Sequence, residues 1–351
     1  MAQYANAIIA KVRALYGRML TPAQYDELLR RQSVQEISAY LREQTPYAGA
    51  LEGVQDSTIH RGQLEHLLQR DLFFQYVRLT KYVRPDEGVY PYIVADMEIG
   101  VILACLRNLI SPSREREDFI ASLPTYLAPY ASFDLFGLAE VRSVEELVAA
   151  LARTPYGPAL QYGLDHFPPL ESGRLRYTAL ELMLRTHYFR DMLRRARGTA
   201  HGEAAKQLRE IVTLRAELIN LSSIWRFKTY FGTPPDRIRP MLLPFRCKLS
   251  GRELDALVEA RDAEAFMAEL RRTAYGRHLE GDDGPIEARL GPLHYARCRH
   301  LLRFSNDPQV VYVAFMMLRT MEVEDVIRII EGVRYGMPPE RIEKLLFKKQ
   351  S

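Results

Sequence analysis

The sequence of 351 residues contains few cysteines and no long apolar run. Its three cysteines, Cys105, Cys247 and Cys298, lie far apart and form no C-x-x-C pair. Such spacing argues against a disulfide framework or a zinc ribbon, and it favours a reducing compartment. The longest apolar runs, residues 99–106 and 310–318, are far shorter than the roughly 20 residues that span a bilayer. We therefore expect two buried helix centres and no transmembrane segment.

Signatures of catalysis are missing as well. No G-x-G-x-x-G, G-x-x-x-x-G-K-[ST], H-E-x-x-H or G-x-S-x-G segment occurs, so the usual phosphate loops, zinc-protease motif and hydrolase elbow are absent. His294 and Cys298 are four residues apart on one face of a predicted helix, but His300 lies off that face and no fourth metal ligand is nearby. We predict no catalytic residue, no cofactor and no metal ion, and a protein that is not an enzyme.

Lysine is also scarce, because only eight of the 48 basic residues are lysines and the net charge is +4. An arginine group, Arg190, Arg194, Arg195 and Arg197, ends a predicted helix, where cations are favoured by the helix dipole. Contact with nucleic acid or lipid is the alternative that we weigh less, and we predict no nucleic-acid partner. Residues 1–16 lack the pattern of a secretory signal, so we expect a cytoplasmic protein.

What the sequence does contain is a unit that occurs three times. Residues 33–51 (SVQEISAYLREQTPYAGAL) and 143–160 (SVEELVAALARTPYGPAL) are identical at ten of eighteen aligned positions, with one gap. Residues 262–279 (DAEAFMAELRRTAYGRHL) match the second copy at eight of eighteen positions. Unrelated segments of average composition would agree at about one position. The key tyrosines, Tyr47, Tyr156 and Tyr275, are spaced by about a third of the chain.

Each copy predicts a short amphipathic helix that ends in a turn. Ser33 and Ser143 begin an S-x-x-E capping box, and Asp262 can cap the third helix alone. Apolar residues follow at helical spacing. Proline then stops the helix in the first two copies, and we expect the tyrosine to return its ring to the core.

Longer segments support an all-α fold. Helical periodicity covers residues 63–84, 94–109, 177–197, 203–230 and 310–334, and no alternating strand pattern is present. Residues 230–238 (YFGTPPDRI) resemble 335–342 (YGMPPERI), each ending a long helix and starting another after the prolines. After residue 109 the corresponding restart is only Ser111-Pro112. We predict three similar helical domains, 1–118, 119–240 and 241–351.

Two acidic residues in the predicted helices need partners. Glu98 precedes Arg107, and Glu217 precedes Arg226, by nine positions along apolar helices. We expect ion pairs between helices to satisfy these charges, although a buried pair does not guarantee stability.

The threefold unit with its T-P-Y turns, the helix restarts at 230–238 and 335–342, and the length together resemble the C subunit of prokaryotic V/A-type ATPases, the homologue of the eukaryotic d subunit. The resemblance covers the full chain. It implies three related domains in a pseudo-threefold, funnel-like socket that receives the central-stalk subunits D and F and rests on the membrane proteolipid (c/L) ring. It further implies a non-catalytic rotor subunit, peripheral at the cytoplasmic face of the cell membrane, that transmits torque between ATP turnover and proton or sodium transport.

Interface residues are harder to choose. Asp236, Arg237, Glu340 and Arg341 stand at the two repeated helix starts and are our candidates, although such charges are also common in a first helical turn.

Two other functions stay open. One is an all-helical repeat adaptor or scaffold with a different partner, although solenoid repeats are usually shorter and more numerous. The other is an enzyme with a site built from scattered residues.

Overall fold

The computed structural model describes residues 2–84, 87–110, 119–120, 122–167, 177–279 and 285–348, and Ser111 and Pro112 lie outside these ranges. The described chain is helical and contains no strand, so the all-α prediction is confirmed. The α-helices are α1 (Ala2–Tyr16), α2 (Pro22–Leu29), α3 (Val34–Gln44), α4 (Arg61–Thr80), α5 (Tyr92–Ile110), α7 (Gly137–Glu140), α8 (Val144–Ala150), α9 (Tyr156–His166), α10 (Tyr177–Thr199), α11 (Gly202–Tyr230), α12 (Pro235–Ile238), α13 (Gly251–Glu259), α14 (Ala263–Arg271), α15 (Ile286–Phe304), α16 (Pro308–Arg334) and α17 (Pro339–Glu343). Four short 3-10 helices complete the elements: η1 (Ala48–Ala50), η2 (Thr125–Leu127), η3 (Arg239–Met241) and η4 (Gly276–His278).

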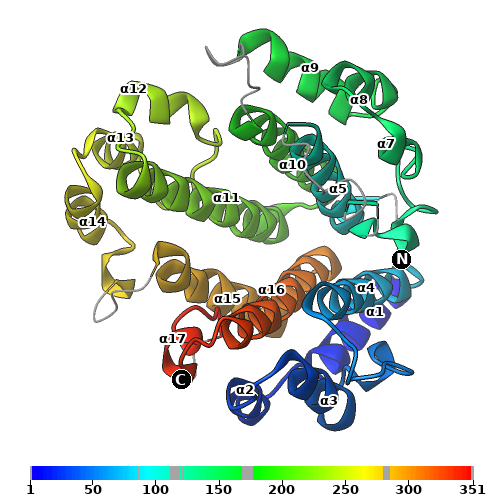
Figure 1. Cartoon of the computed structure of the whole chain (residues 1–351). Helices are drawn as coiled ribbons and strands as arrows, with labels where there is room; N and C mark the ends of the chain where they lie inside the picture. The colour runs from blue at the N-terminus through cyan, green and yellow to red at the C-terminus, as the bar shows by residue number, and fades with distance from the viewer. Residues whose placement is uncertain are drawn as a thin grey trace.

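The long helices occupy the middle of the molecule, and the short ones lie outside them (Figure 1). All five long helices predicted from periodicity are present, as α4, α5, α10, α11 and α16. Helix α16 packs against α15, α4, α1 and α11, while α10 packs against both α5 and α11. The outer groups are α2 with α3, α7 to α9, and α12 to α14 (Figure 1).

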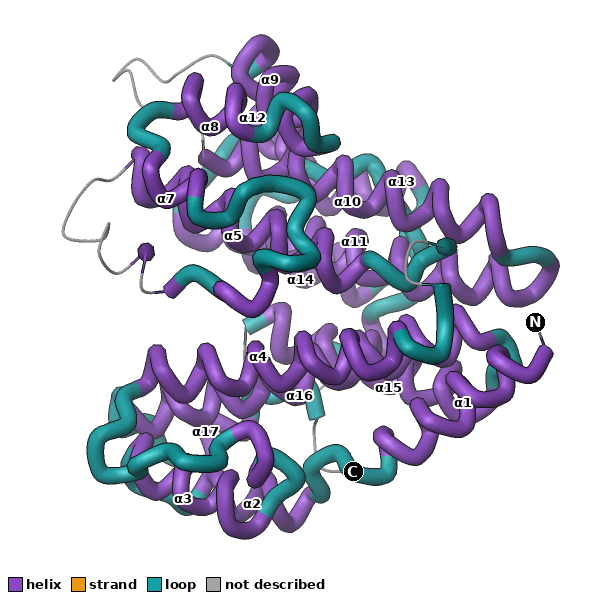
Figure 2. The backbone as a smooth tube through the Cα atoms, turned by 90° about the vertical axis from the view of Figure 1, so that its right-hand side faces the viewer, coloured by secondary structure: helices purple, strands orange, loops and turns teal. Residues whose placement is uncertain are grey.

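The two ends of the chain meet on α16. Helices α2 and α3 from the N-terminal part and α17 from the C-terminal part all contact it. Figure 2 shows these three helices together at one end of α16. Neither end of the chain therefore forms a unit separate from the other.

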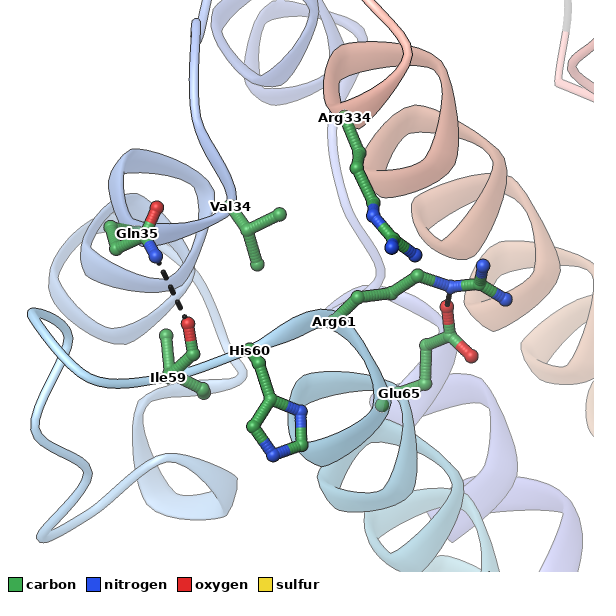
Figure 3. Close-up of a pocket in the computed structure, with 8 residues that line it drawn as sticks. Val34, Gln35, Ile59, His60, Arg61, Glu65 and Arg334 are labelled. Carbon is green, nitrogen blue, oxygen red and sulfur yellow. Dashed lines mark hydrogen bonds and ion pairs between the residues drawn. The ribbon is translucent and has the colours of Figure 1, made fainter. Parts of the chain in front are cut away.

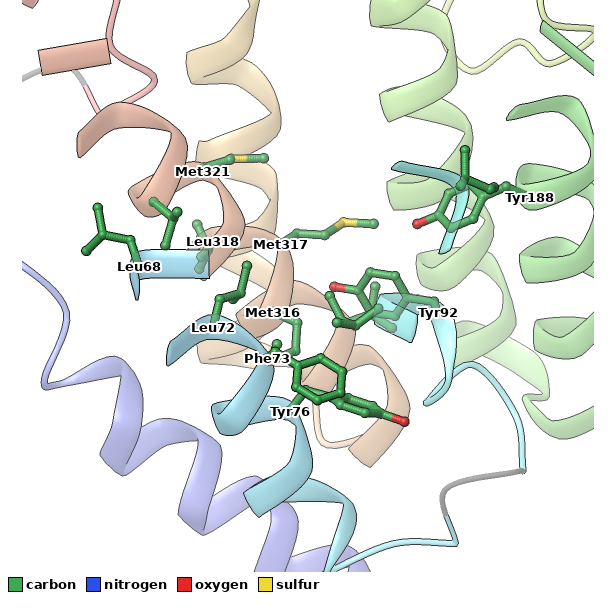
Figure 4. Packing of buried hydrophobic residues seen from close by; sticks show 14 of the residues in the cluster. Leu68, Leu72, Phe73, Tyr76, Tyr92, Tyr188, Met316, Met317, Leu318 and Met321 are labelled. Atoms are coloured by element: carbon green, nitrogen blue, oxygen red, sulfur yellow. The ribbon is translucent and has the colours of Figure 1, made fainter. Parts of the chain in front are cut away.

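The core is centred on the apolar run 310–318 of α16, in which every side chain is at most 3% exposed. Met316 and Leu318, with Met321 beyond them, meet Leu72 and Phe73 of α4 (Figure 4). Methionine is flexible and fills irregular gaps, so it suits a surface where several helices converge. Residues of the other apolar run, in α5, are also largely buried, and both runs are helix centres as predicted.

The predicted helix starts are present. The side chains of Ser33, Ser143 and Asp262 accept hydrogen bonds from the backbone N–H three residues later, and so begin α3, α8 and α14. In α13 the Ser250 hydroxyl and the Glu253 carboxylate form a complete capping box. Each cap satisfies N–H groups that have no partner inside the helix.

Candidate functional site: a cavity between three long helices

A threonine turn orients the repeated tyrosine in all three copies of the unit. The hydroxyl of the threonine two residues earlier accepts the backbone N–H of Tyr47, Tyr156 and Tyr275 at 3.2 Å each. The same threonine hydroxyl donates to a carbonyl near the end of the preceding helix. The three tyrosines are at most 3% exposed, so their predicted return to the core is confirmed.

Each buried tyrosine hydroxyl donates to a buried glutamate, and we call this hydrogen bond a tyrosine clasp. Tyr156 donates to Glu98 of α5 at 2.6 Å, and Tyr275 donates to Glu217 of α11. In both of these local clasps the two residues are 58 positions apart. The clasps tie an outer turn to a long inner helix.

The third clasp joins opposite parts of the chain, and we call it the closing clasp. Tyr47 donates to Glu322 of α16 at 3.1 Å, across a sequence separation of 275. The other oxygen of Glu322 accepts the backbone N–H of Leu20 at 2.7 Å, and Arg319 donates to the same carboxylate. Arg319 also forms an ion pair with Asp71 of α4 at 3.2 Å, so the network includes α4.

These contacts correct the prediction that ion pairs between helices satisfy the two acidic residues. Glu98 accepts hydrogen bonds from the Tyr156 hydroxyl and the backbone N–H of Ser132. Glu217 accepts hydrogen bonds from the Tyr275 hydroxyl and the backbone N–H groups of residues 247, 248 and 249. The donors to both carboxylates are therefore uncharged groups. Arg226 does form an ion pair between helices, with Glu287 of α15 at 2.7 Å.

An open cavity of about 590 Å³ lies between the long helices, among them α11 and α16, which carry two of the clasp glutamates. It is bounded mainly by α10, α11 and α16, with α15 and Phe347 completing the wall. Along α11 most of the lining residues between Arg215 and Phe227 follow the i, i+3, i+4 spacing of one helix face, and Phe231 lines the cavity just after the helix ends. Helix α11 also packs against α10, α15 and α16 around the cavity. The cavity therefore has a wall to which four long helices contribute.

Every arginine that lines the cavity is paired within the chain. The four pairs are Arg185 with Glu181 at 2.7 Å, Arg215 with Asp96 at 3.5 Å, Arg226 with Glu287 at 2.7 Å, and Arg328 with Glu324 at 3.5 Å and Asp325 at 3.0 Å. The three carboxylates in the described lining are members of these pairs. Burial of Arg215 opposes its charge, but Asp96 and Tyr188, whose hydroxyl lies 3.1 Å from the guanidinium, raise the pKa of this arginine.

Two titratable groups in the wall differ in their access to the cavity. Glu324 lines the cavity, and 44% of its side chain is accessible. Burial raises its pKa, against the opposing charges of Arg328 and Arg215. His294 is only 5% exposed, and burial lowers its pKa to about 3. This histidine is therefore neutral at physiological pH.

A second, smaller cavity of about 470 Å³ lies beside the start of α4 (Figure 3). Its polar groups already have structural roles. Gln35 donates to the Ile59 carbonyl at 3.1 Å, His60 accepts the N–H of Gln63 and caps α4, and Arg61 pairs with Glu65 and Glu331. These contacts hold the first turn of α4, so we assign no ligand to this cavity.

The structure places the four predicted interface residues in two separate pairs. Asp236 and Arg237 are exposed on α12, and Glu340 and Arg341 are exposed on α17. Helices α12 and α17 lie apart in both views (Figures 1 and 2). No ion pair within the described ranges involves any of the four residues. The sequence did not indicate the cavity wall, because its residues come from helices far apart in the chain.

The remaining candidate groups of the sequence have ordinary surroundings. His294 and Cys298 are both buried, and the described residues contain no group of three or more possible metal ligands. In the arginine group at the end of α10, Asp191 pairs with Arg194 and Arg195 on the same helix. No helix in the described part of the chain is long and apolar enough to cross a membrane.

Comparison with known proteins gives a consistent result. A family model for the ATP synthase (C/AC39) subunit matches residues 8–345. The A-type ATP synthase C subunit of Desulfurococcus sp. (strain SY) is 24% identical over 344 residues, which cover 96% of this chain and 88% of that protein. The C subunit of the same enzyme from Pyrococcus abyssi is 24% identical over 347 residues, with the same two shares. That of Methanosarcina mazei is 25% identical over 356 residues, 98% of this chain and 93% of the relative.

Proposed function

We propose that this chain, which belongs to the ATP synthase (C/AC39) subunit family, is the rotor socket of its complex. Members of this family are structural, non-catalytic subunits of a rotary ATPase. In this role the chain links the central shaft to the membrane proteolipid ring and transmits torque between them. Its place is at the cytoplasmic face of the cell membrane, held there through the complex.

The observation that carries the proposal is the cavity between α10, α11 and α16. Long helices with buried apolar faces make a stiff wall, which a part that transmits torque requires. The tyrosine clasps connect the outer turns to these helices through buried hydrogen bonds. We assign the cavity to the central-stalk subunits D and F, because it is a concave surface whose wall is built from long helices of the described chain.

We also propose that the socket is built from three related units around this cavity. Each would combine a long helix that carries a clasp glutamate with the outer turn that carries its tyrosine. In the third unit the long helix is α16 and the outer turn follows α3, so the unit takes its parts from both ends of the chain. The boundaries 1–118, 119–240 and 241–351 stay a prediction, and the closing clasp connects the first of those ranges to the last.

For contact with the proteolipid ring we propose Asp236, Arg237, Glu340 and Arg341. They are exposed and take part in no ion pair of the described chain, so their charges are available to a partner. Contacts between exposed charges weaken at high salt, which suits an interface that separates reversibly. Alanine at all four positions should weaken ring binding, whereas Arg30→Ala, which removes a surface pair with Glu27, should leave it unchanged.

The first test is a low-salt pull-down from solubilised membranes of the host, with this chain tagged and the recovered proteins identified by mass spectrometry. Recovery of subunits D and F together with the proteolipid is the expected result. A different, reproducible partner without these subunits would instead support the alternative, an all-helical adaptor or scaffold.

A further inference from the structure

The last described residues form a short strap beside α16. After α17 the side chain of Leu346 is buried, and Phe347 and Lys348 follow it. We call Phe347 and Lys348 the C-terminal strap. Their backbone N–H groups donate to the two carboxylate oxygens of Asp325 of α16, at 2.8 and 3.1 Å. One side chain of α16 therefore holds the backbone of the whole strap.

The ring of Phe347 fills a notch between α15 and α16. Gly291 of α15 leaves room for it, because a methyl group at this position would lie 2.6 Å from Cε1 of the ring. The guanidinium carbon of Arg328 lies 3.9 Å from the ring centroid, which is a favourable contact between a cation and an aromatic ring. Arg328 also pairs with Asp325 at 3.0 Å, so it contacts both the ring and the carboxylate that holds the strap.

Lys348 connects the strap to the N-terminal part of the chain. Its amine donates to the Leu20 carbonyl and lies 4.9 Å from the centroid of the Tyr25 ring of α2. Phe347 itself lines the cavity between the long helices. The strap is therefore both a part of the cavity wall and a link between the two ends of the chain.

The strap covers the carboxylate that holds it. Asp325 is 1% exposed, and both of its oxygens face the strap. Burial raises the pKa of this carboxyl to about 7, against the hydrogen bonds from the strap and the charge of Arg328, while Glu324 acts with burial. Once the strap lifts, water reaches Asp325 and its pKa falls toward about 4, the value of an aspartate in water. The closed strap therefore binds a proton more tightly than the open one.

Other ionisable groups surround this contact. They come from every neighbouring element: Glu324 and Arg328 on α16, Tyr25 on α2, Tyr295 and Arg299 on α15, and Glu322 facing the Lys348 amine. Burial raises the pKa of both tyrosines well above its usual range, so they are neutral near pH 7. Burial lowers the pKa of Lys348, against the charges of Glu322 and Asp325. In the described chain Asp325 accepts both backbone hydrogen bonds of the strap, so its ionisation acts on the strap directly.

We propose that the C-terminal strap is a releasable latch, which stays closed while Asp325 is protonated and opens when Asp325 ionises. An ionised carboxylate still accepts the two hydrogen bonds, but water solvates its charge better once the strap has lifted. The stabilising contribution of the proton is complete below about pH 4 and is lost as the pH rises through about 7. Opening removes Phe347 from the cavity wall and Lys348 from Leu20, while α15 and α16 stay folded. The inference goes beyond the proposed function and does not depend on it.

Hydrogen exchange of the full chain, followed by mass spectrometry of the C-terminal peptide, tests the latch through the amides of Phe347 and Lys348. Rates are corrected for the intrinsic effect of pH. From about pH 6 to about pH 8 we expect the protection of the two amides to fall about tenfold, because the pKa is about 7 in the closed state and about 4 in the open one. In Asp325→Asn, which cannot ionise, the protection should change by less than about twofold.

A peptide from the buried part of α11 shows whether the strap opens by itself. Exchange of its amides requires unfolding of that helix, whereas a latch opens locally. We therefore expect the two strap amides to exchange at least about tenfold faster than those of α11 at both pH values.

Phe347→Ala tests the notch. Loss of the ring removes its contact with Arg328 and leaves the notch at Gly291 empty, so the protection of the two amides at about pH 6 should fall about tenfold. Phe304→Ala is the matched control, because Phe304 ends α15, the helix that carries Gly291, and is 70% exposed. It should keep the protection of the wild type. Circular dichroism should show the same helix content in all three variants.

Each part of the proposal can fail separately. Equal protection at both pH values in the wild type, or the same pH dependence in Asp325→Asn, would overturn the release by ionisation. Unchanged protection in Phe347→Ala would overturn docking in the notch. Strap amides that exchange as slowly as those of α11 would mean that the strap opens only when the whole chain unfolds, and the latch would be disproved. None of these results bears on the proposed function, which recovery of subunits D and F tests.

Discussion

The local clasps and the closing clasp use the same tyrosine and glutamate but differ in what they connect. Tyr156–Glu98 and Tyr275–Glu217 join residues 58 positions apart, whereas Tyr47–Glu322 joins residues 275 apart. A local clasp can form within a single segment of the chain, because both of its residues lie in that segment. The closing clasp must bring together both ends of the chain, which carries a larger loop-closure cost.

The closing clasp is also surrounded by more charge. Arg319 is 4% exposed and is shared between Glu322 and Asp71. Nearby, Asp325 accepts the backbone N–H groups of Phe347 and Lys348, and the Lys348 amine donates to the Leu20 carbonyl. The segments around Glu322 come from opposite ends of the chain. Polar side chains thus provide the connections that a continuous backbone provides around Glu217. We call the contact between the two ends of the chain the seam. Unlike the local clasps, the seam depends on a buried ionic network.

The largest effect should come from Glu322→Leu. It leaves Arg319 with only Asp71, and it removes the acceptor of the Leu20 N–H and the Tyr47 hydroxyl. We expect a loss of about 3–5 kcal/mol in the free energy of unfolding, measured with urea. Glu217→Leu, which leaves neutral donors unpaired, should cost about 2–3 kcal/mol. An equal or larger loss for Glu217→Leu would remove the proposed distinction between the clasps.

A second substitution should restore part of the stability that Glu322→Leu removes. When Arg319→Met is added to Glu322→Leu, no buried arginine remains without its partner, and we expect recovery of about 1–2 kcal/mol relative to the single variant. The same urea titrations give the answer. Strictly additive losses would mean that the charge of Arg319 does not determine the stability of the seam.

The seam should also respond to pH through Asp325. Burial raises the pKa of this carboxyl to about 7, against the hydrogen bonds from Phe347 and Lys348 and the charge of Arg328, while Glu324 acts with burial. Because the folded pKa is above the ordinary value, the stabilising contribution is complete below about pH 4 and is lost as the pH rises through about 7. Between about pH 5 and about pH 8 the wild type should lose about 2 kcal/mol more than Asp325→Asn. Parallel stability curves for the two proteins would contradict this assignment.

The smallest losses of stability should come from removing the helix caps, which all three copies of the repeat share. Ser33→Ala, Ser143→Ala and Asp262→Ala each remove one helix cap, and each should cost about 1 kcal/mol. Thermal unfolding of the three variants provides the measurement. A markedly larger loss for Ser33→Ala would indicate that the unit of Tyr47 and Glu322 depends on local structure as well as on the closing clasp.

The local features of the repeat could be predicted from the sequence because their causes are local. Caps at Ser33, Ser143 and Asp262 form within one helical turn, and the burial of the tyrosines follows from the turn that precedes them. The partners of Glu98 and Glu217 could not be predicted in this way, since they lie 58 residues away on other elements. One signal was present: Glu98 and Glu217 are 119 positions apart, the same separation as Tyr156 and Tyr275.

Glu322 had no comparable signal. Glu324 and Asp325 follow it closely, and Glu331, not an arginine, stands nine residues later, so the segment resembles a solvated helix face. In the structure Glu322 is 1% exposed. Only the packing of α3 and the start of α2 against α16 makes this position a buried one.

By itself the sequence determined the all-helical class, the starts of the repeated helices and the places of their tyrosines, because capping and periodicity act over a few residues. The tertiary structure alone decided which glutamate each tyrosine meets, that the closing clasp joins both ends of the chain, and that the arginines of the cavity have carboxylate partners within the chain. Those outcomes depend on contacts between helices that are distant in the sequence, and such contacts leave no local pattern.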